Sequence, residues 1–203
     1  ITNLTKNKRL DSGSVLPRVH SDWGYYDLAG QDGHIHELTV SYSDNISNNF
    51  YGRIHGGFLE PHFAGFGGEI LYKKPKSPLA IGLDIHHVVR REYDMLFDLR
   101  DYSVTTGHLS FYYDPGKIVD VELNVGRYLA RDWGATTTIS RRFSNGWEVA
   151  GYATFTEVPF EDFGEGSFDK GFYIKIPLDW ILGSPTIPLR RFEIRPITRD
   201  GGA

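Results

Sequence analysis

Acidic residues gather near the C-terminal end of the chain, where they could hold a metal ion or act on a sugar. Glu157, Glu161, Asp162, Glu165 and Asp169 lie close together in the sequence. Several carboxylate oxygens can bind calcium, and a pair of carboxyl groups can hydrolyse a glycosidic bond. Glycines interrupt the cluster, however, and a Gly-rich acidic segment is typical of a solvated loop. We therefore predict an external loop carrying Glu161, Asp162, Glu165 and Asp169, with no catalytic role.

Histidines are the other side chains that could bind a metal, and their spacing does not favour a metal site. The chain has eight His and no Cys, which excludes disulfides and most zinc or thiol chemistry. His86 and His87 are adjacent in a predicted strand, so they point to opposite faces and cannot bind one ion together. His34 and His36 share a face, but no clear carboxylate partner accompanies them. We predict no metal and no cofactor.

Catalysis by a serine nucleophile is not favoured either. Ser110 lies two positions from His108, and with Asp120 it would supply the residue types of a hydrolase triad. Residues at this spacing lie side by side on one face of a strand, and packing explains that arrangement more simply. The chain also lacks a GxSxG motif and a phosphate-binding loop. We therefore expect a protein that is not an enzyme.

The elements that carry these residues are predicted to be strands. Apolar and polar residues alternate with a period of two in about ten segments, and no stretch of about 12 residues has the period of a helix. A weaker eleventh segment is at about 18–28. The ten segments are at about 34–43, 49–58, 65–73, 79–90, 104–113, 117–128, 135–143, 147–157, 171–178 and 187–196. The pattern predicts an all-β fold.

The length of the predicted strands helps to distinguish a soluble sheet from one that crosses a membrane. Most have about 9–12 residues, whereas strands of soluble sheets usually have about 5 or 6 and a strand that crosses a bilayer needs about 9–11. The composition agrees with a sheet, since aromatic residues make up 14% of the chain and Gly occurs 23 times. A net charge of −4 gives no reason to expect nucleic acid as a partner. Strand length favours a membrane β-barrel.

Within each predicted strand one face is apolar and the other is polar. Trp147, Val149 and Phe155, for example, alternate with Glu148 and Tyr152. In a membrane barrel the apolar face meets lipid and the polar face lines the lumen, whereas in a soluble sandwich the apolar face would form a dry core. The polar face is predicted to form a lumen-facing network of Glu37, Arg53, His55, Glu69, Asp84, His86, Arg90, His108, Asp120, Glu122, Arg142, Glu148, Lys175, Arg191, Glu193 and Arg195.

The charges of this network have mixed signs, which does not favour an open channel for an anionic polymer. Opposite charges across a narrow lumen more often form ion pairs, and a barrel of about 12 strands lies between the filled 8-stranded and the open 16-stranded cases. Tyr51, Tyr112, Tyr152 and Tyr173 also face inward, where their rings would fill space or stack on sugars. A scaffold, assembly or glycan-contact role is therefore favoured over transport through the lumen.

Two turns predict how neighbouring strands pair. Residues 144–146 read Ser-Asn-Gly, and a three-residue loop with its glycine in the left-handed conformation pairs Phe143 with Trp147. A two-residue loop would move the apolar residues to the other face, so it is not favoured. By the same reasoning the Asp-Pro-Gly turn that follows Tyr113 pairs this residue with Lys117.

Connections between the predicted strands alternate in length. Short ones are expected at 44–48, 59–64, 74–78, 114–116 and 144–146, one of intermediate length at 129–134, and longer ones at 91–103 and 158–170. Short turns at one end and longer loops at the other are typical of outer-membrane barrels, as are aromatic residues such as Tyr72 and Trp147 near strand ends. We predict an antiparallel up-and-down transmembrane β-barrel of about 11–12 strands.

Several long motifs resemble the YjbH-type exopolysaccharide outer-membrane protein family. They are GFLEPHFAGFGGEILYKK at 57–74, FDLRDYSVTTGHLSFYYD at 97–114, VGRYLARDWGATTTISRRFSNG at 125–146, EDFGEGSFDKGFYIKIP at 161–177 and FEIRPITRDGG at 192–202. They follow the order of the family and cover the chain from about residue 16 to its end. The resemblance implies a β-barrel in the Gram-negative outer membrane, encoded beside machinery that makes or exports an extracellular polysaccharide. It brings no catalytic residues with it.

Family members are longer, so the chain resembles their C-terminal portion. We expect an N-terminal lead-in or linker at 1–15 and a barrel domain at 16–203, as a fragment of a longer protein. A closed bacterial barrel has an even number of strands. Eleven strands therefore call for a final strand from beyond Ala203 or from another segment.

Three functions are compatible with the sequence. The leading hypothesis is a non-enzymatic protein of the bacterial outer membrane that takes part in exopolysaccharide or capsule secretion or assembly. Its partners would be outer-membrane lipid, a polysaccharide and other secretion proteins of the periplasm or outer membrane. The alternatives are an outer-membrane enzyme that acts on glycan or lipid, and a soluble β-sandwich that binds glycan.

Overall fold

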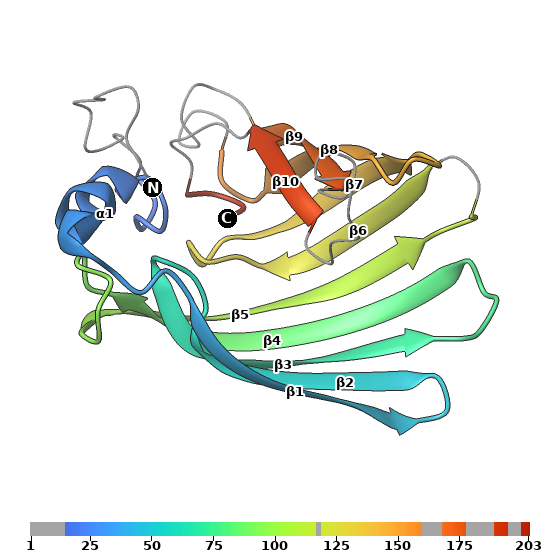
Figure 1. Cartoon of the computed structure of the whole chain (residues 1–203), viewed down its shortest axis with the longest axis horizontal. Helices are drawn as coiled ribbons and strands as arrows, with labels where there is room; N and C mark the ends of the chain where they lie inside the picture. Colours follow the sequence, from blue (N-terminus) through green and yellow to red (C-terminus); the bar gives the residue numbers. More distant parts are fainter. Residues whose placement is uncertain (1–14, 117–118, 160–167, 178–188, 195–199) are drawn as a thin grey trace.

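The computed structural model describes residues 15–116, 119–159, 168–177, 189–194 and 200–203 (Figure 1). Its helices are the α-helix α1 (Trp23–Ala29) and the 3-10 helix η1 (Gly30–Asp32). Its strands are β1 (Leu38–Ser47), β2 (Phe50–Phe58), β3 (Phe63–Lys73), β4 (Leu79–Arg91), β5 (Leu99–Tyr113), β6 (Asp120–Arg127), β7 (Trp133–Arg142), β8 (Glu148–Thr156), β9 (Asp169–Pro177) and β10 (Leu189–Ile194). None of the described helices is long and apolar enough to cross a membrane.

The strands form one antiparallel sheet whose strand order follows the sequence from β1 to β10. Each strand pairs with the strands before and after it, so the predicted all-β, up-and-down topology is confirmed. The sheet is strongly curved, and β6–β10 arch back over β1–β5 (Figure 1). In the described part of the chain β1 pairs only with β2, and β10 only with β9, so the sheet is open at these two edges.

The described residues contain ten strands, compared with about 11–12 expected for the complete barrel. The weak strand expected at about 18–28 is replaced by α1. Tyr26 of this helix packs its ring against that of His62, with 4.2 Å between centroids, and its hydroxyl donates to the carbonyl of Arg91 at 2.8 Å. These tertiary contacts favour a helix at the end of the sheet over an edge strand with weak alternation.

The turn between β7 and β8 has the predicted form. The amide of Phe143 donates to the carbonyl of Trp147 at 2.8 Å, and Gly146 has a φ of +85°. The left-handed conformation of this glycine closes a three-residue loop. Arg142 therefore faces Glu148 across the two strands, as expected.

The predicted pairing of β5 with β6 is wrong by four residues. Tyr113 pairs with Val121 instead of Lys117. The amide of Asp114 donates to the carbonyl of Pro78 at 2.7 Å, so this residue continues the pairing of β5 with the segment before β4 and does not turn at once into β6. A shift by an even number of residues keeps every side chain on its face, so the apolar pattern cannot distinguish the two registers.

The two faces of the sheet differ as the alternation predicts. On the convex face large apolar side chains are exposed, and Val40 retains 79% of its accessible surface. In β8 the apolar residues Val149 and Phe155 are exposed, whereas Glu148 and Thr154 are buried on the concave face. The described residues form a single sheet, and within them no second sheet covers the apolar face.

A small apolar core lies at the end of the sheet where the N-terminal segment, residues 15–37, packs. Val19 of this segment contacts Phe63, Val88, Val104 and Ala130, all of them buried. The segment thus sits over the ends of several strands, and both described ends of the chain are found there (Figure 1).

Candidate functional site on the concave face

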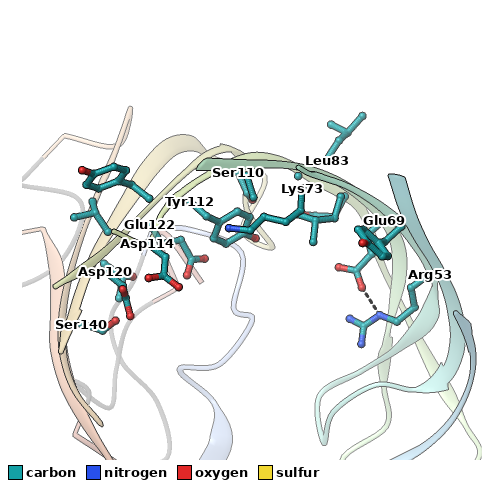
Figure 2. Close-up of a pocket in the computed structure, with 18 of the residues that line it drawn as sticks. Arg53, Glu69, Lys73, Leu83, Ser110, Tyr112, Asp114, Asp120, Glu122 and Ser140 are labelled. Atoms are coloured by element: carbon teal, nitrogen blue, oxygen red, sulfur yellow. Dashed lines mark ion pairs between the residues drawn. The ribbon is translucent and has the colours of Figure 1, made fainter. Parts of the chain in front are cut away.

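Polar residues of β1–β5 line up in a row across the concave face. Ser43, Arg53, Glu69, Asp84 and His108 are direct neighbours on successive strands. Residues opposite one another on adjacent strands share a face, so these five side chains lie together. Arg53 and Glu69 form an ion pair (Figure 2). The Nδ1 atom of His108 lies 3.4 Å from Oδ2 of Asp84.

A second row brings two histidines together across an intervening strand. His55 of β2 and His86 of β4 both face Gly67 of β3. Gly67 leaves the space in which the two rings meet, because a Cβ there would overlap the ring of His86. The Nε2 atoms of His55 and His86 are 3.1 Å apart, and Nδ1 of His86 is 3.3 Å from Oδ2 of Asp84. The polar groups of three strands are therefore connected through one carboxylate.

Another group of charges lies on β6–β9. The Nζ atom of Lys175 donates to Oε1 of Glu148 at 2.8 Å, and the hydroxyl of Tyr173 donates to the same oxygen at 3.2 Å. Nε of Arg142 lies 3.7 Å from Oε2 of Glu148, and its NH2 group lies 3.9 Å from Oδ2 of Asp120. Mixed charges thus pair with one another here, as the sequence predicts.

Arg53, Glu69 and Asp84 of the first row line a hollow of about 740 Å³ on the concave face together with the charges on β6–β9. Lys73, Tyr112, Asp114 and Glu122 also point into it, whereas Leu83 points away on the other side of the sheet (Figure 2). A smaller hollow of about 390 Å³ shares part of this lining, Tyr112 and Glu122 included, and extends to the C-terminal residues. Carboxylates, cations and tyrosine rings along one hollow can hydrogen-bond to and stack on a sugar chain.

The remaining members of the predicted network lie in different places. Glu122 accepts a hydrogen bond from Asn124 on the lining of the hollow, at 2.8 Å. Arg90 is buried and binds Asp22 of the N-terminal segment, so it belongs to the closed end of the sheet. Glu37 is exposed and precedes β1, and its carboxylate lies 3.5 Å from the hydroxyl of Thr39. Strand β1 begins at Leu38, four residues later than predicted. The side chains of Arg191 and Glu193, and all of Arg195, lie outside the described residues.

The acidic cluster near the C-terminal end is only partly described. Glu161, Asp162 and Glu165 lie outside the described residues. Asp169 is not in an external loop as predicted, because it is the first residue of β9, where it pairs with Thr154 and is buried. Strand β9 begins two residues earlier than expected, which places Asp169 on the concave face.

Of the residues of the weak serine triad, Ser110 lines the smaller hollow with His108 and the larger one with Asp120. His108 contacts Asp84, as described above, and Asp120 lies near Arg142. His34 and His36 have ring centroids 6.2 Å apart, and Nδ1 of His34 lies 2.9 Å from the carbonyl oxygen of Gly30.

Sequence reasoning missed the polar contacts that fasten the N-terminal segment to the end of the sheet. Asp22 is buried against Arg90 and accepts a hydrogen bond from the hydroxyl of Tyr93 at 3.1 Å. Oδ1 of Asp200 accepts hydrogen bonds from three successive amides, those of residues 19–21, at 2.9–3.0 Å. These partners are up to 181 residues apart in the sequence, so no local pattern reveals them.

A further group at this end was also missed. His20, Glu60 and His62 place one ligand atom each within 4.8 Å of the other two. Nε2 of His20 lies 3.0 Å from Oε1 of Glu60. Burial lowers the pKa of His62 from 6.5 to about 3, so this imidazole is neutral at neutral pH. His20 is separated from the other two by helix α1 and strands β1 and β2, which explains why spacing did not reveal the group.

Comparison with known proteins identifies two matches. The model of a family described as "Exopolysaccharide biosynthesis protein YbjH" matches residues 1–203. The chain is 42% identical over 194 residues to a protein of Escherichia coli (strain K12) named "Uncharacterized lipoprotein YjbH". The match covers 93% of this chain and 28% of that relative, so the chain spans less than a third of the relative's length. No solved structure matches.

Proposed function

Because this chain belongs to the YjbH family of exopolysaccharide biosynthesis proteins, we propose that it forms a non-enzymatic β-barrel of the bacterial outer membrane that takes part in exopolysaccharide secretion or assembly. The description of the family supports a role in exopolysaccharide production. The barrel, its place in the outer membrane and the absence of catalysis are the proposal.

The observation that carries the proposal is the polarity of the two faces. Leu38, Val40, Ile54, Phe66 and Ile85 are all exposed on the convex face, while charged and polar residues occupy the concave face. A water-soluble protein rarely exposes a large continuous apolar surface, whereas a membrane barrel turns this surface to lipid. A soluble sandwich would need a second sheet over this face.

Aromatic residues at both ends of the strands support a membrane position. Phe50 packs against Tyr72 at the end with short turns, with 4.9 Å between ring centroids. Phe58 packs against Phe97 at the other end, with 5.8 Å between centroids. Phe50 and Phe58 are the two ends of β2, roughly 26 Å apart at about 3.3 Å per residue. This length is comparable with the apolar band of outer-membrane barrels, about 25 Å, which aromatic girdles flank.

Contacts near the two edges of the sheet support closure into a barrel. Asp200, which follows β10 in the sequence, binds the backbone of residues 19–21, which precede β1. The amide of Gly202 also donates to Asp132 at 2.8 Å, close to the start of β7. Segments that flank the two edge strands are thus held together at one end of the sheet.

The lining of the hollow supports contact with a glycan. Its charges form pairs of both signs, such as Arg53 with Glu69 and Lys175 with Glu148, and do not present a single sign to an ion. Tyr112 and Tyr173 supply rings beside these groups. We infer that partners of this protein are outer-membrane lipid, a polysaccharide and other secretion proteins of the periplasm or outer membrane.

Electrophoretic mobility with and without boiling tests the barrel. The protein would be refolded into detergent and run in SDS in both states. We expect the unboiled sample to migrate differently, because a closed barrel resists SDS until it is heated. Equal mobility, together with good solubility in buffer without detergent, would contradict the membrane barrel.

The role in secretion needs a separate test in cells. Deletion of the gene should lower the amount of surface polysaccharide under conditions that induce its synthesis, and the intact gene should restore it. Unchanged polysaccharide in the deletion strain would count against the proposed role, even if the purified protein is a barrel.

A further inference from the structure

Two histidines and a glutamate from separate parts of the chain meet where the N-terminal segment packs on the sheet. His20 belongs to the N-terminal segment, and Glu60 and His62 belong to the connection between β2 and β3. Their ligand atoms lie within 4.8 Å of one another. Pairs of ligand atoms around a four-coordinate zinc ion are roughly 3–3.5 Å apart, given Zn–N and Zn–O distances of about 2.0–2.2 Å. Small rotations of the side chains would bring these three atoms to that spacing.

The ring of His62 supplies an independent sign of a missing ligand. His62 is only 8% exposed, and among the described residues no hydrogen-bond partner reaches its Nε2 atom. A buried ring nitrogen without a partner is destabilising, because burial removes its hydrogen bond to water and no protein group replaces it. This nitrogen is one of the two ring atoms through which histidine binds metals.

We propose that His20, Glu60 and His62 bind a zinc ion that fastens the N-terminal segment to the end of the sheet. Two imidazole nitrogens and one carboxylate oxygen suit zinc, whereas calcium and magnesium prefer oxygen ligands alone. The side chains of His20 and Glu60 are 30% and 35% exposed, so water can reach the fourth coordination position. The site therefore has a buried ligand on one side and an open position on the other.

The surroundings hold the ligands in place, and one of the two arginines near the site is paired with a carboxylate. Arg91 donates from NH1 to the carbonyl of Glu60 at 2.9 Å, which fixes the backbone of one ligand residue. The amide of His20 is bound by Asp200 at 3.0 Å, which fixes the backbone of another. The cation of Arg90 is paired with Asp22, which limits its repulsion of a bound metal ion.

Zinc binding by the full chain, refolded in detergent and stripped with a chelator, tests the site. Isothermal titration with Zn²⁺ should give one site per chain, and Co²⁺ should give the visible absorption of a four-coordinate ion. H20A and E60Q should each weaken Zn²⁺ binding about tenfold or more, because H20A removes a ligand and E60Q replaces a charged carboxylate by a neutral amide that binds zinc weakly. H36A is the matched control, since this exposed histidine of the same segment lies outside the group.

Protection of the N-terminal segment from trypsin gives a second readout that does not depend on the affinity measurement. Zn²⁺ should slow cleavage within residues 15–37 in the native protein and in H36A, and should have no effect in H20A or E60Q. H62A is not needed for the test, so a folding defect at this buried position cannot obscure it. Absence of a stoichiometric site, or equal binding by H20A, E60Q and the native protein, would overturn the proposal. Either result leaves the mobility test of the barrel unaffected.

Discussion

At the level of single residues, charges and rings on the concave side of the sheet are held by specific partners. His55 and His86 meet only because Gly67 stands between them without a side chain. Asp84 then joins His86 to His108. Each of these side chains has at least one polar partner in the described structure, and such pairing offsets part of the cost of burying polar groups.

The buried pair of Asp22 and Arg90 gives the sharpest prediction at this scale. D22A should destabilise the packing of the N-terminal segment by about 3–5 kcal/mol, because it leaves the Arg90 guanidinium buried without its carboxylate. Urea-dependent proteolysis of residues 15–37 measures this local unfolding. The double variant D22A/R90M should recover much of the loss, since no unpaired charge is left. Equal destabilisation in the single and double variants would show that charge pairing is not the cause.

At the level of elements, hairpins determine which residues face each other. The turn at 144–146 places Arg142 opposite Glu148, and the carboxylate of Glu148 also forms an ion pair with Lys175 of β9. A local glycine thus positions a charge group that spans three strands. The β5–β6 turn also contains a glycine with a positive φ, Gly116 at +72°, but β5 continues its pairing as far as Pro78, which precedes β4, before the chain turns into β6.

A substitution at Gly146 tests the role of the first turn. G146V should destabilise the β7–β8 hairpin by about 1–2 kcal/mol, because a β-branched residue disfavours a φ of +85°. S144A is the control in the same turn, since Ser144 does not have a positive φ. Urea unfolding midpoints of the refolded proteins measure the difference. Matching midpoints for the two variants would mean that the turn conformation does not limit stability.

At the level of the whole molecule, the curved sheet separates an apolar convex face from a polar hollow. Adjacent residues of one strand therefore face different surroundings. Ile139 of β7 is 53% exposed on the convex face, whereas its neighbour Thr138 lines the hollow beside Glu122. If the convex face meets lipid, a charge there should be costly and a charge on the other side should be tolerated.

An arginine at each of these neighbouring positions tests the orientation of the sheet. I139R should lower the free energy of unfolding in lipid vesicles by about 2–4 kcal/mol, the cost of a cation on the lipid face of a barrel. T138R places the same side chain in the hollow next to Glu122, where it should cost far less. Denaturant titration in vesicles of a single lipid composition measures both. A greater loss for T138R would reverse the assignment of the two faces.

The sequence alone determined the properties that depend on local alternation. Strand type, strand order, the faces of β8 and the three-residue turn at 144–146 follow from a period of two and one glycine, and the structure agrees with them. A side chain in a strand has only two faces to choose between, so the pattern contains this information in full. The family resemblance was confirmed by comparison in the same way.

Tertiary structure decided whatever depends on contacts between distant residues. The segment around Tyr26 forms a helix and not the predicted strand, and the β5–β6 register differs by four residues from the predicted one. Asp169 belongs to β9 on the concave face and not to a loop. Tertiary structure also brought His20 to Glu60. None of these outcomes changes the local alternation, so the sequence pattern is the same with or without them. They depend on which packing buries more surface and satisfies more polar groups, and only the folded chain determines that.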